Sequence, residues 1–328
     1  MNWYLQSGKE SDVVFNTKIM YIRNFRNYRF NITKEEAKKM ENEIKDKLLS
    51  LGYNLKLLRI NDMDDITKST LVEKDLISKK CKENEYGYND ILVNDEENIC
   101  IIINEDDHVK LQVFSGGFEL EETFNYAKEI DKKIEETFDI AKSEKYGYLT
   151  KKLTNVGTGM KVYITLHLPG LKRTANLEKV LNTIRSFGVD ISSKTSDIYE
   201  ISNKQTIGTT EEEIINKMKV IVEKVIEQER EARRILAKNQ ILLEDNVYRS
   251  YGLISNCKKI TEDETEKLLS DIKLGVDLGI IKEITDSQIL KLYLYTKKAN
   301  LQKKIGQNLD KFDRDIKRSE IIKEIIKS

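Results

Sequence analysis

The chain has 328 residues, enough to bury a sizeable core in one large or two ordinary domains. Its 56 basic and 56 acidic residues cancel, so net charge draws it neither to nucleic acid nor to an anionic membrane, and we expect no partner of either kind. The sequence has no apolar run of about 18 residues and no apolar core of a signal peptide near its N-terminus, and we therefore expect a cytoplasmic protein.

Three cysteines are too few and too scattered for a disulfide framework or a zinc site. Cys81, Cys100 and Cys257 lack the paired spacing of metal ligands, so we expect no bound structural metal and a reducing compartment. Cys100 lies inside the apolar run 99–103 and is expected in the core.

The first half of the chain predicts two helices with several strands between them. Thr33 and Glu36 have the spacing of a capping box, and the helix that they begin is expected to end at Gly52. Residues 53–115 alternate short apolar runs with polar turns, which is typical of strands with one short helix among them. Neighbouring strands of one sheet are predicted at 91–93, 99–103 and 111–114. Apolar residues then recur at helical spacing over 120–141.

The second half begins with a glycine-containing turn and a buried strand, both within residues 145–171. A helix and a strand follow, at 175–187 and 197–202. After a further capping box the sequence is almost wholly helical. We therefore predict an α+β domain in residues 1–210 and an all-helical domain in residues 211–328.

The turn itself, Thr-Asn-Val-Gly-Thr-Gly, is a candidate for ligand binding. Thr154, Asn155, Gly157 and Gly159 offer backbone N–H groups and positions that tolerate positive φ angles. Such a turn can present its backbone to a phosphate. The pattern matches neither the P-loop nor the dinucleotide-binding fingerprint, so a tight turn without a ligand is the alternative.

Several segments, in order and in register, resemble the ATP:guanidino phosphotransferases. The resemblance is greatest to the bacterial protein-arginine kinases of the McsB type, and it runs nearly from end to end. The matching segments are Asp12–Asn24, Asn104–Gln112, Thr154–Gly159, His167–Pro169, Ile201–Gly208, Tyr248–Leu253 and Leu269–Ile281.

This resemblance implies a fold, an activity and partners. The fold is α+β, an antiparallel sheet flanked by helices that holds the active site, followed by an all-helical domain used to form a homodimer. The activity is phosphoryl transfer from ATP, with Mg²⁺, to arginine side chains of proteins in the stress response and protein quality control. The implied partners are a stress-response repressor, a Clp ATPase with its protease, and a zinc-finger activator.

Phosphoryl transfer to a guanidinium needs cations that bind the phosphates and carboxylates that orient the guanidinium and take its proton. Magnesium must also bridge the phosphates. The family supplies most of the cations as arginines, whose planar forks bind phosphate oxygens bidentately. In this chain the two arginines of the first motif are replaced by Lys18 and Met20.

The acidic motif keeps its carboxylates with one shortening. The family's pair of glutamates becomes Glu105 and Asp106, and the arginine two residues after His108 becomes Lys110. The carboxylates could hold magnesium through water, or form a solvated turn. His108 could act as a ligand or an acid, although hydrogen bonds to nearby backbone are the expected use of its ring. We expect His167 to be a core histidine.

Lysines also stand on both sides of the glycine turn. Lys152 takes the place of a family cysteine, and Lys161 the place of an arginine. A family loop with an arginine and a glutamate is missing before Ile201, and Lys194 is a candidate to replace that arginine. By resemblance, the nucleotide-binding residues are Lys18, His108, Lys110, Lys161, Thr154, Asn155, Gly157 and Gly159, and the catalytic ones are Glu105 and Asp106.

These changes lead us to expect that phosphoryl transfer is lost or severely reduced, because removing one transition-state donor costs about 10²–10³ in rate. The chain would then act by binding, as a phosphoarginine-reading or regulatory partner of the repressor and protease system. An active protein-arginine kinase that uses lysines in place of arginines is the alternative. A structural partner without a ligand of its own is the third hypothesis.

The segment 314–319, Arg-Asp-Ile-Lys-Arg-Ser, resembles the family's phosphoarginine-binding motif. Arg314 and Arg318 are one helical turn apart and could hold a phosphoryl group, while Asp315 could pair with the guanidinium. An ordinary charged helix end is the alternative.

Overall fold

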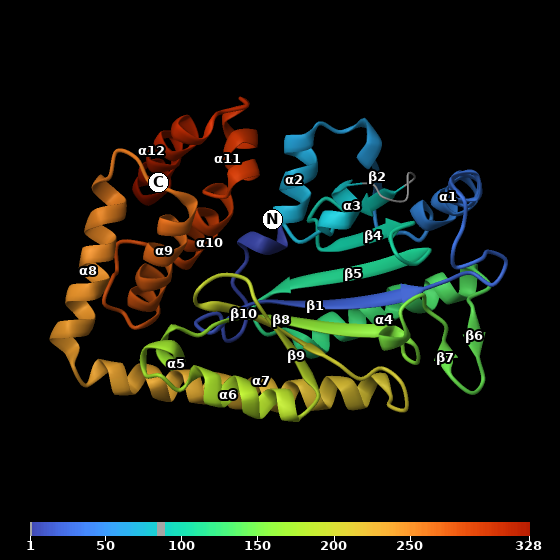
Figure 1. Cartoon of the computed structure of the whole chain (residues 1–328), viewed down its shortest axis with the longest axis horizontal. Coiled ribbons are helices and arrows are strands. Elements are labelled where there is room, and N and C mark those ends of the chain that lie inside the picture. The colour runs from blue at the N-terminus through green and yellow to red at the C-terminus, as the bar shows by residue number, and fades with distance from the viewer. Residues whose placement is uncertain (1, 84–88) are drawn as a thin grey trace.

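A single antiparallel sheet of eight strands organises the first part of the computed structural model, which describes residues 2–83 and 89–328 (Figure 1). The strand order is β2-β3-β4-β5-β1-β8-β10-β9, so β1 lies inside the sheet between β5 and β8. The strands are β1 (Val14–Arg23), β2 (Lys56–Arg59), β3 (Asp90–Val93), β4 (Ile99–Ile103), β5 (Val109–Gly116), β8 (Met160–His167), β9 (Val189–Ser193) and β10 (Ile198–Asn203), with a separate ribbon of β6 (Lys142–Ser143) and β7 (Gly147–Tyr148).

Helices flank this sheet and form the whole of the C-terminal part, so the predicted fold class is confirmed. Thr33 and Thr210 form the capping boxes that begin α1 and α7. The helices are α1 (Lys34–Leu49), α2 (Asp65–Glu73), α3 (Lys79–Glu83), α4 (Leu120–Thr137), α5 (Pro169–Arg173), α6 (Leu177–Ser186), α7 (Glu211–Ala237), α8 (Gln240–Asn256), α9 (Glu262–Asp277), α10 (Asp286–Tyr295), α11 (Lys298–Ile305) and α12 (Lys311–Lys327), with short 3₁₀ turns η1 (Trp3–Leu5), η2 (Ile60–Asp62) and η3 (Leu153–Asn155).

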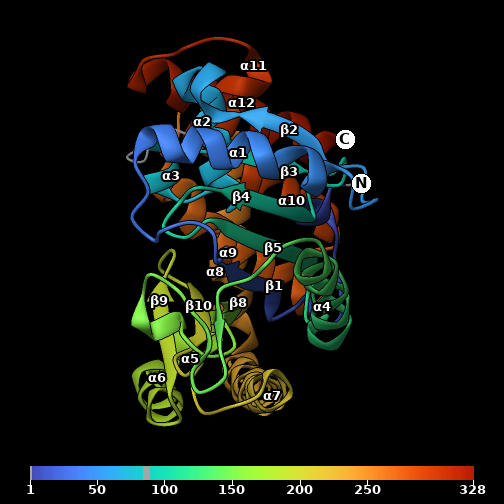
Figure 2. The same cartoon turned by 90° about the vertical axis from the view of Figure 1, so that its right-hand side faces the viewer.

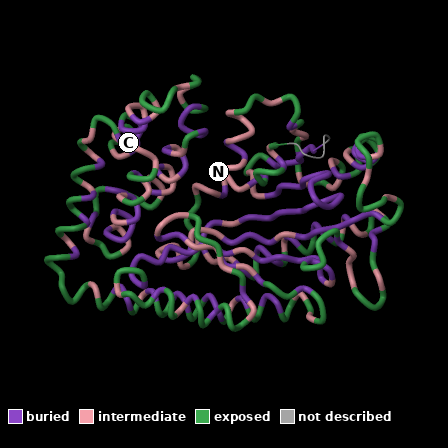
Figure 3. The backbone as a smooth tube through the Cα atoms, in the orientation of Figure 1, coloured by how far each residue is buried: buried purple, intermediate pink, exposed green. Residues whose placement is uncertain are grey.

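The two faces of the sheet are covered differently. Ile19, Ile101 and Leu111 belong to a large hydrophobic cluster with α1, α4 and α7. Because side chains alternate along a strand, Cys100 and Ile102 point to the opposite face, where a smaller cluster packs under η1 and α2. The inner strands β3, β4, β5 and β8 are therefore buried almost throughout (Figure 3), whereas the edge strands β2 and β9 are largely exposed or half-buried. Cys100 is a core residue, as the sequence predicted.

Helix α7 packs into the core of the sheet domain. Met218, Val222 and Val225 share the large cluster with the sheet, whereas α8–α12 enclose a separate cluster around Leu269 and Leu292. The core therefore changes between α7 and α8, whereas the sequence placed the domain boundary before α7, at residue 210. The apolar stripe of α7 predicts that the helix packs against other elements, but it does not indicate which of the two cores the helix joins.

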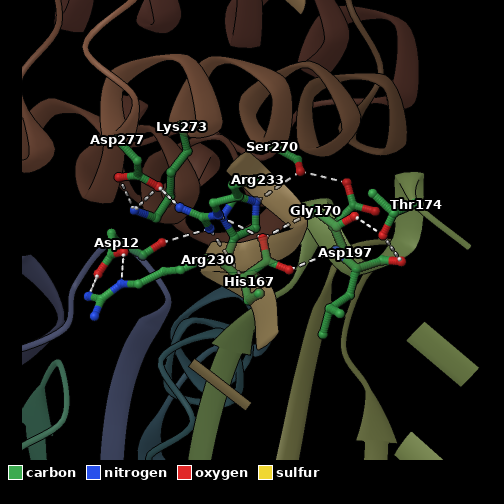
Figure 4. A network of polar contacts seen from close by, with 12 residues as sticks. Asp12, His167, Gly170, Thr174, Asp197, Arg230, Arg233, Ser270, Lys273 and Asp277 are labelled. Atoms are coloured by element: carbon green, nitrogen blue, oxygen red, sulfur yellow. Dashed lines mark hydrogen bonds and ion pairs between the residues drawn. The ribbon is translucent and has the colours of Figure 1, made fainter. Parts of the chain in front are cut away.

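Arg233 on α7 is the centre of a buried polar network that joins the two parts of the molecule (Figure 4). Its Nε donates to Glu229 Oε1 at 2.7 Å, and its Nη1 lies 3.2 Å from Asp277 Oδ2 of α9. Its Nη2 donates to the carbonyl of Asp12 at 2.9 Å. Glu229 in turn accepts from the first free N–H groups of α5, at 2.8 and 2.9 Å.

His167, at the end of β8, lies beside this network and is fully buried. Its Nε2 is 2.9 Å from the hydroxyl of Ser270, which itself donates to Asp197 at 2.5 Å. The ring therefore donates from Nε2, and its Nδ1 has no partner among the described residues. Burial, together with the positive charges of Arg233 and Lys273, holds the pKa of His167 well below its usual value.

Replacing His167 with glutamine should remove a pH-dependent part of the stability. The folded-state pKa is below the unfolded value of about 6.5, so the unfolded chain binds the proton more readily. The contribution of the neutral ring to the free energy of unfolding is thus fully present above about pH 6.5. It is lost as pH falls toward the folded-state pKa. Below about pH 6.5 we expect the unfolding free energy of the wild type to fall more steeply than that of His167→Gln, by up to about 1.4 kcal/mol per pH unit. Urea denaturation at several pH values measures both slopes, and equal slopes would contradict the prediction.

Candidate functional site

A cavity of about 490 Å³ lies on the face of the sheet opposite α4 and α7. It is lined by β1, β4, β5 and β8, by the connection from α2 to α3, and by the segment before the glycine turn. Five lysines and four carboxylates contribute to its lining. Its volume is within the range of small-molecule sites, about 300–1,000 Å³.

Strand β1 directs Lys18 and Met20 toward the cavity, because Ile19 between them points into the core. The ammonium of Lys18 lies 4.5 Å from the ring centroid of Tyr163, its neighbour in register on β8. Its Nζ is 2.5 Å from Asp75 Oδ2. Burial by itself lowers the pKa of Lys18, but the Asp75 carboxylate raises it above the usual value. Lys18 is therefore a charged lysine that already has a carboxylate partner.

The turn between β4 and β5 brings the two predicted catalytic carboxylates to the same cavity. Glu105 pairs with Lys110 and accepts a hydrogen bond from the hydroxyl of Ser78. Asp106 Oδ2 lies 2.5 Å from Lys152 Nζ and 3.8 Å from Lys110 Nζ. The side chains of both carboxylates are under 10% exposed. Each of them is thus paired with a lysine of the cavity.

The backbone of the glycine turn is used within the fold. The N–H groups of Gly157 and Thr158 donate to backbone carbonyls at 3.2 and 2.9 Å. Gly157 has φ +115°, and a Cβ there would lie 2.1 Å from the carbonyl oxygen of Thr206. Gly159 has φ +60°, and a Cβ there would lie 2.5 Å from Arg23 Nη1. Close packing thus requires glycine at both positions. The N–H groups of Gly157 and Thr158 already have backbone partners, so they do not form the phosphate cradle that the sequence suggested.

Other residues near the turn divide between the cavity and the interior. Asn155 lines the cavity, whereas the carbonyl of Thr154 accepts the hydroxyl of Thr206 at 2.9 Å. Lys161 is absent from the cavity lining, and its Nζ donates to the carbonyl of Asn203 at 2.7 Å. Burial lowers the pKa of Lys161. Lys161 therefore does not point into the cavity, where the predicted contact with the nucleotide would require its ammonium.

His108 follows the acidic turn, but the main chain uses both nitrogens of its ring. Nδ1 accepts from the N–H of Phe25 at 3.0 Å. Nε2 then carries the proton and donates to the carbonyl of Arg29 at 2.9 Å. Burial lowers the pKa of His108, which favours this neutral ring. These contacts favour the structural role over the predicted nucleotide contact.

A tight hairpin stands where the family has its longer loop. Strands β9 and β10 are joined by residues 194–197 alone. Lys194 Nζ lies 3.1 Å from Glu200 Oε2 and 4.0 Å from Asp75 Oδ1, the carboxylate that also pairs with Lys18. Lys194 therefore approaches the cavity without lining it, and its charge is matched by two acids.

Comparison with known proteins identifies the family. A family model of the ATP:guanido phosphotransferase C-terminal catalytic domain matches residues 36–232, and a model of the protein-arginine kinase McsB C-terminal domain matches residues 240–328. The protein-arginine kinases of Bacillus pumilus and Bacillus subtilis are 38% and 37% identical to this chain, over 98% of it and 92% of their own length. The chain belongs to the protein-arginine kinase family. The gap between the two matched ranges, residues 233–239, covers the end of α7, and the second range begins with α8, where the core changes.

Solved structures of other guanidino kinases share the fold. The duplicated taurocyamine kinase from Schistosoma mansoni with bound transition state analog components has a TM-score of 0.60 and 20% identity, over 68% of this chain and 34% of that one. A lombricine kinase has a TM-score of 0.57 and 19% identity, over 68% of each chain. At this identity the likeness concerns the fold.

Protein-arginine kinases depend on ATP, and the cavity fits a magnesium nucleotide in residue type but not in arrangement. Lysines can bind phosphate as point charges, and Glu105 and Asp106 suit magnesium-bound water. However, Lys18, Lys110 and Lys152 each have a carboxylate partner, so phosphate would compete with three ion pairs.

Within residues 2–83 and 89–328, no group of three or more His, Cys, Asp or Glu side chains is placed to hold a metal ion. No helix in the same part of the chain is long and apolar enough to cross a membrane.

The predicted phosphoarginine-binding residues lie together on α12, but Asp315 and Arg318 are buried and Arg314 is half-buried. Arg318 is 2% exposed and donates to the carbonyls of Thr296 and Ile260, at 2.7 and 2.8 Å. Asp315 accepts from Arg318 at 2.6 Å, and Arg314 donates to the main chain just before α12. The open clamp predicted from helical spacing is therefore not formed, because these groups hold α12 against the segments that precede α9 and follow α10.

Sequence reasoning missed Asp75 and Ser78, which complete the cavity. They lie 57 and 27 positions from Lys18 and Glu105, the residues that they bind. Asp75 follows α2 with φ +61°, so the only local signal was that of a turn. Nothing in its neighbourhood in the sequence indicates that the carboxylate meets a lysine of β1.

Arg23, the last residue of β1, connects the glycine turn to α4. Its Nη2 lies 2.6 Å from Asp131 Oδ2, and its Nη1 donates to the carbonyl of Thr158 at 3.0 Å. Its guanidinium also lies 3.6 Å from the ring centroid of Tyr148. The arginine is 1% exposed, so this ion pair is shielded from water.

Replacing Arg23 with methionine should destabilise the protein by about 3–5 kcal/mol, because the Asp131 carboxylate would stay buried without its partner. Arg26→Met is the matched control. Arg26 pairs with Asp139, and both side chains are more than half exposed, so this change should stay within about 0.5 kcal/mol. Urea denaturation gives both values, and similar losses would contradict the role assigned to Arg23.

Proposed function

We propose that this member of the protein-arginine kinase family is impaired in phosphoryl transfer and acts by binding other proteins. The observation that carries the proposal is the 2.5 Å contact between Lys152 Nζ and Asp106 Oδ2. In the family's reaction this carboxylate would orient the substrate guanidinium and take its proton. Here an ammonium already holds it. A guanidinium brought to about 4 Å from that ammonium would be repelled by about 4 kcal/mol at an effective dielectric of about 20.

The phosphate side of the cavity supports the same proposal. Lys18 is held by Asp75, and Lys110 is held by Glu105. A triphosphate would have to break these pairs, and a lysine cannot replace the bidentate contact of an arginine. The loop that carries a further arginine in the family is reduced to the hairpin at residues 194–197. Cations are thus present, but their charge is largely balanced from within.

One observation favours an active kinase as the second candidate. Five lysines still line one cavity together with Glu105 and Asp106. ATP·Mg²⁺ would compete for them by mass action, and binding would free the carboxylates. A nucleotide at 100 times its Kd should then raise the unfolding free energy by about 2.7 kcal/mol.

A kinase assay separates the two candidates. Phosphoarginine formed on an unfolded protein substrate is measured by ³¹P NMR, with the Bacillus subtilis protein-arginine kinase as positive control. We expect transfer by this chain to be at least about 100-fold slower, because donor and base geometry are both altered. A rate within about tenfold of the control would overturn the proposal.

A double variant tests whether the contact between Lys152 and Asp106 causes the proposed loss of phosphoryl transfer. Lys152→Cys removes the ammonium from Asp106, and Asp106→Glu restores the longer carboxylate. We expect the double variant to exceed the wild-type rate of phosphoarginine formation by about tenfold or more, since both the charge and the reach of the base are corrected. Lys151→Cys, one position away, is the control and should leave the rate unchanged. A double variant no faster than the control would show that Lys152 is not the cause.

For the binding role, we propose a cytoplasmic homodimer that regulates or recruits other proteins. The candidates by resemblance are a stress-response repressor, a Clp ATPase and a zinc-finger activator. Phosphoarginine is the proposed ligand at Arg314, Asp315 and Arg318, and its entry would require Arg318 to exchange its carbonyl partners for phosphate oxygens. Titration with a phosphoarginine peptide should raise the Tm, and Arg314→Gln should reduce that rise. No rise in Tm would count against this ligand.

A further inference from the structure

Helices α6 and α7 lie side by side and enclose a groove of about 810 Å³ on the outside of the sheet domain (Figure 2). This groove is separate from the cavity described above, because it shares no residue with that cavity's lining. None of its lining residues belongs to the proposed phosphoarginine site either. Its walls come from two regular helices, so it is a preformed surface.

The floor of the groove is apolar. Val180 and Ile184 of α6 face Val220 and Ile221 of α7, and Phe187 stands at the end of α6. Phe187 and Val220 are 56% and 59% exposed, so the groove contains two apolar side chains that water can reach. Covering such surface gains about 25 cal/mol for each Å² removed from water, so an apolar partner would be stabilised there.

The rim of the groove is basic. Lys179, Lys217 and Lys224 belong to its lining, which otherwise contains only neutral residues. Lys224 pairs with Glu227 at 2.7 Å, whereas neither Lys179 nor Lys217 forms an ion pair with any residue that the structure describes. The groove therefore presents two unbalanced ammonium groups above an apolar floor.

We propose that this groove is a docking site for an acidic amphipathic helix of a partner protein. Apolar side chains on one face of such a helix would cover Val220 and Phe187, and its carboxylates would meet Lys179 and Lys217. A second copy of this chain is disfavoured, since two identical grooves placed face to face would bring lysines against lysines. Nucleic acid would leave the apolar floor uncovered, and anionic vesicles are the competing ligand in the test below.

The dimensions suit a helical partner. Helix α6 has ten residues and is about 15 Å long, so a partner helix of three to four turns spans the groove. Its apolar anchors would recur at helical spacing, and acidic residues would flank them. A peptide of about 18 residues, about 27 Å as a helix, is therefore a sufficient probe.

The test uses the full chain and a synthetic peptide of that length, with leucines at heptad spacing and glutamates beside them. Fluorescence anisotropy measures its Kd, and a probe with lysines in place of the glutamates is the matched control. We expect the acidic probe to bind at least about tenfold more tightly than the basic one. Lys179→Glu with Lys217→Glu should reverse that preference.

The floor is tested separately. Val220→Ser should weaken the acidic probe by about tenfold, because an apolar anchor loses its contact. Ile241→Ser is the control, since Ile241 is 83% exposed and lies on α8, outside the groove. It should leave the Kd unchanged. Circular dichroism confirms that each variant is folded.

Four results would overturn the proposal. The first two are failure of both probes to bind and equal affinity of the chain for the two probes. The third is a Kd for the acidic probe that does not change in Val220→Ser. The fourth is binding of a single-stranded oligonucleotide, or of vesicles containing phosphatidylserine, that depends on Lys179 and is tighter than binding of the acidic probe. Sedimentation velocity addresses the second copy. A fall in oligomeric state in Val220→Ser but not in Ile241→Ser would assign the groove to self-association instead.

Discussion

The buried guanidinium of Arg233 is the constraint on which the arrangement of the two domains depends. A charge taken out of water costs several kcal/mol unless it is paired and hydrogen-bonded, so the folded chain has to bring partners to it. Those partners come from distant places: Glu229 on the same helix, Asp277 on α9, and the carbonyl of Asp12 near the N-terminus. Satisfying this one side chain therefore joins the first strand, the sheet domain and the helical domain.

The same requirement extends to the elements around it. Glu229 can stay buried because α5 directs its free N–H groups at the carboxylate, which places α5 against α7. Helix α7 then covers the sheet with one side and forms the wall of the α6–α7 groove with another. None of the residues that line the cavity on the opposite face of the sheet takes part in this network. The family fold is thus compatible with an altered set of cavity residues.

In the cavity, as around Arg233, charged side chains are paired within the protein. Lys18 and Lys110 reach the cavity from strands β1 and β5, Lys152 reaches it from the segment before the glycine turn, and each meets a carboxylate. In a partly buried site, ion pairing within the protein lowers the cost of keeping these charges out of water. It also occupies the groups that would otherwise act on a nucleotide and a guanidinium. In the function proposed above, these same ion pairs are what opposes phosphoryl transfer.

Local patterns predicted much of this. Caps at Thr33 and Thr210, the buried strand around Cys100 and the family motifs are short-range features, and the structure agrees with them. The predictions that differed all depended on partners far away in the chain. The N–H groups of the glycine turn meet another segment, the ammonium of Lys161 meets the carbonyl of Asn203, and Arg318 turns inward to two carbonyls.

The sequence by itself thus determined the family, the fold class and the identity of the residues that replace the family's arginines. Those properties depend on residue order and on the periodicity of apolar side chains, both of which are local. Only the tertiary structure decided whether a polar group is free or already bound. That depends on which groups the fold brings within about 3 Å of one another, and here Asp75 meets Lys18 from 57 positions away.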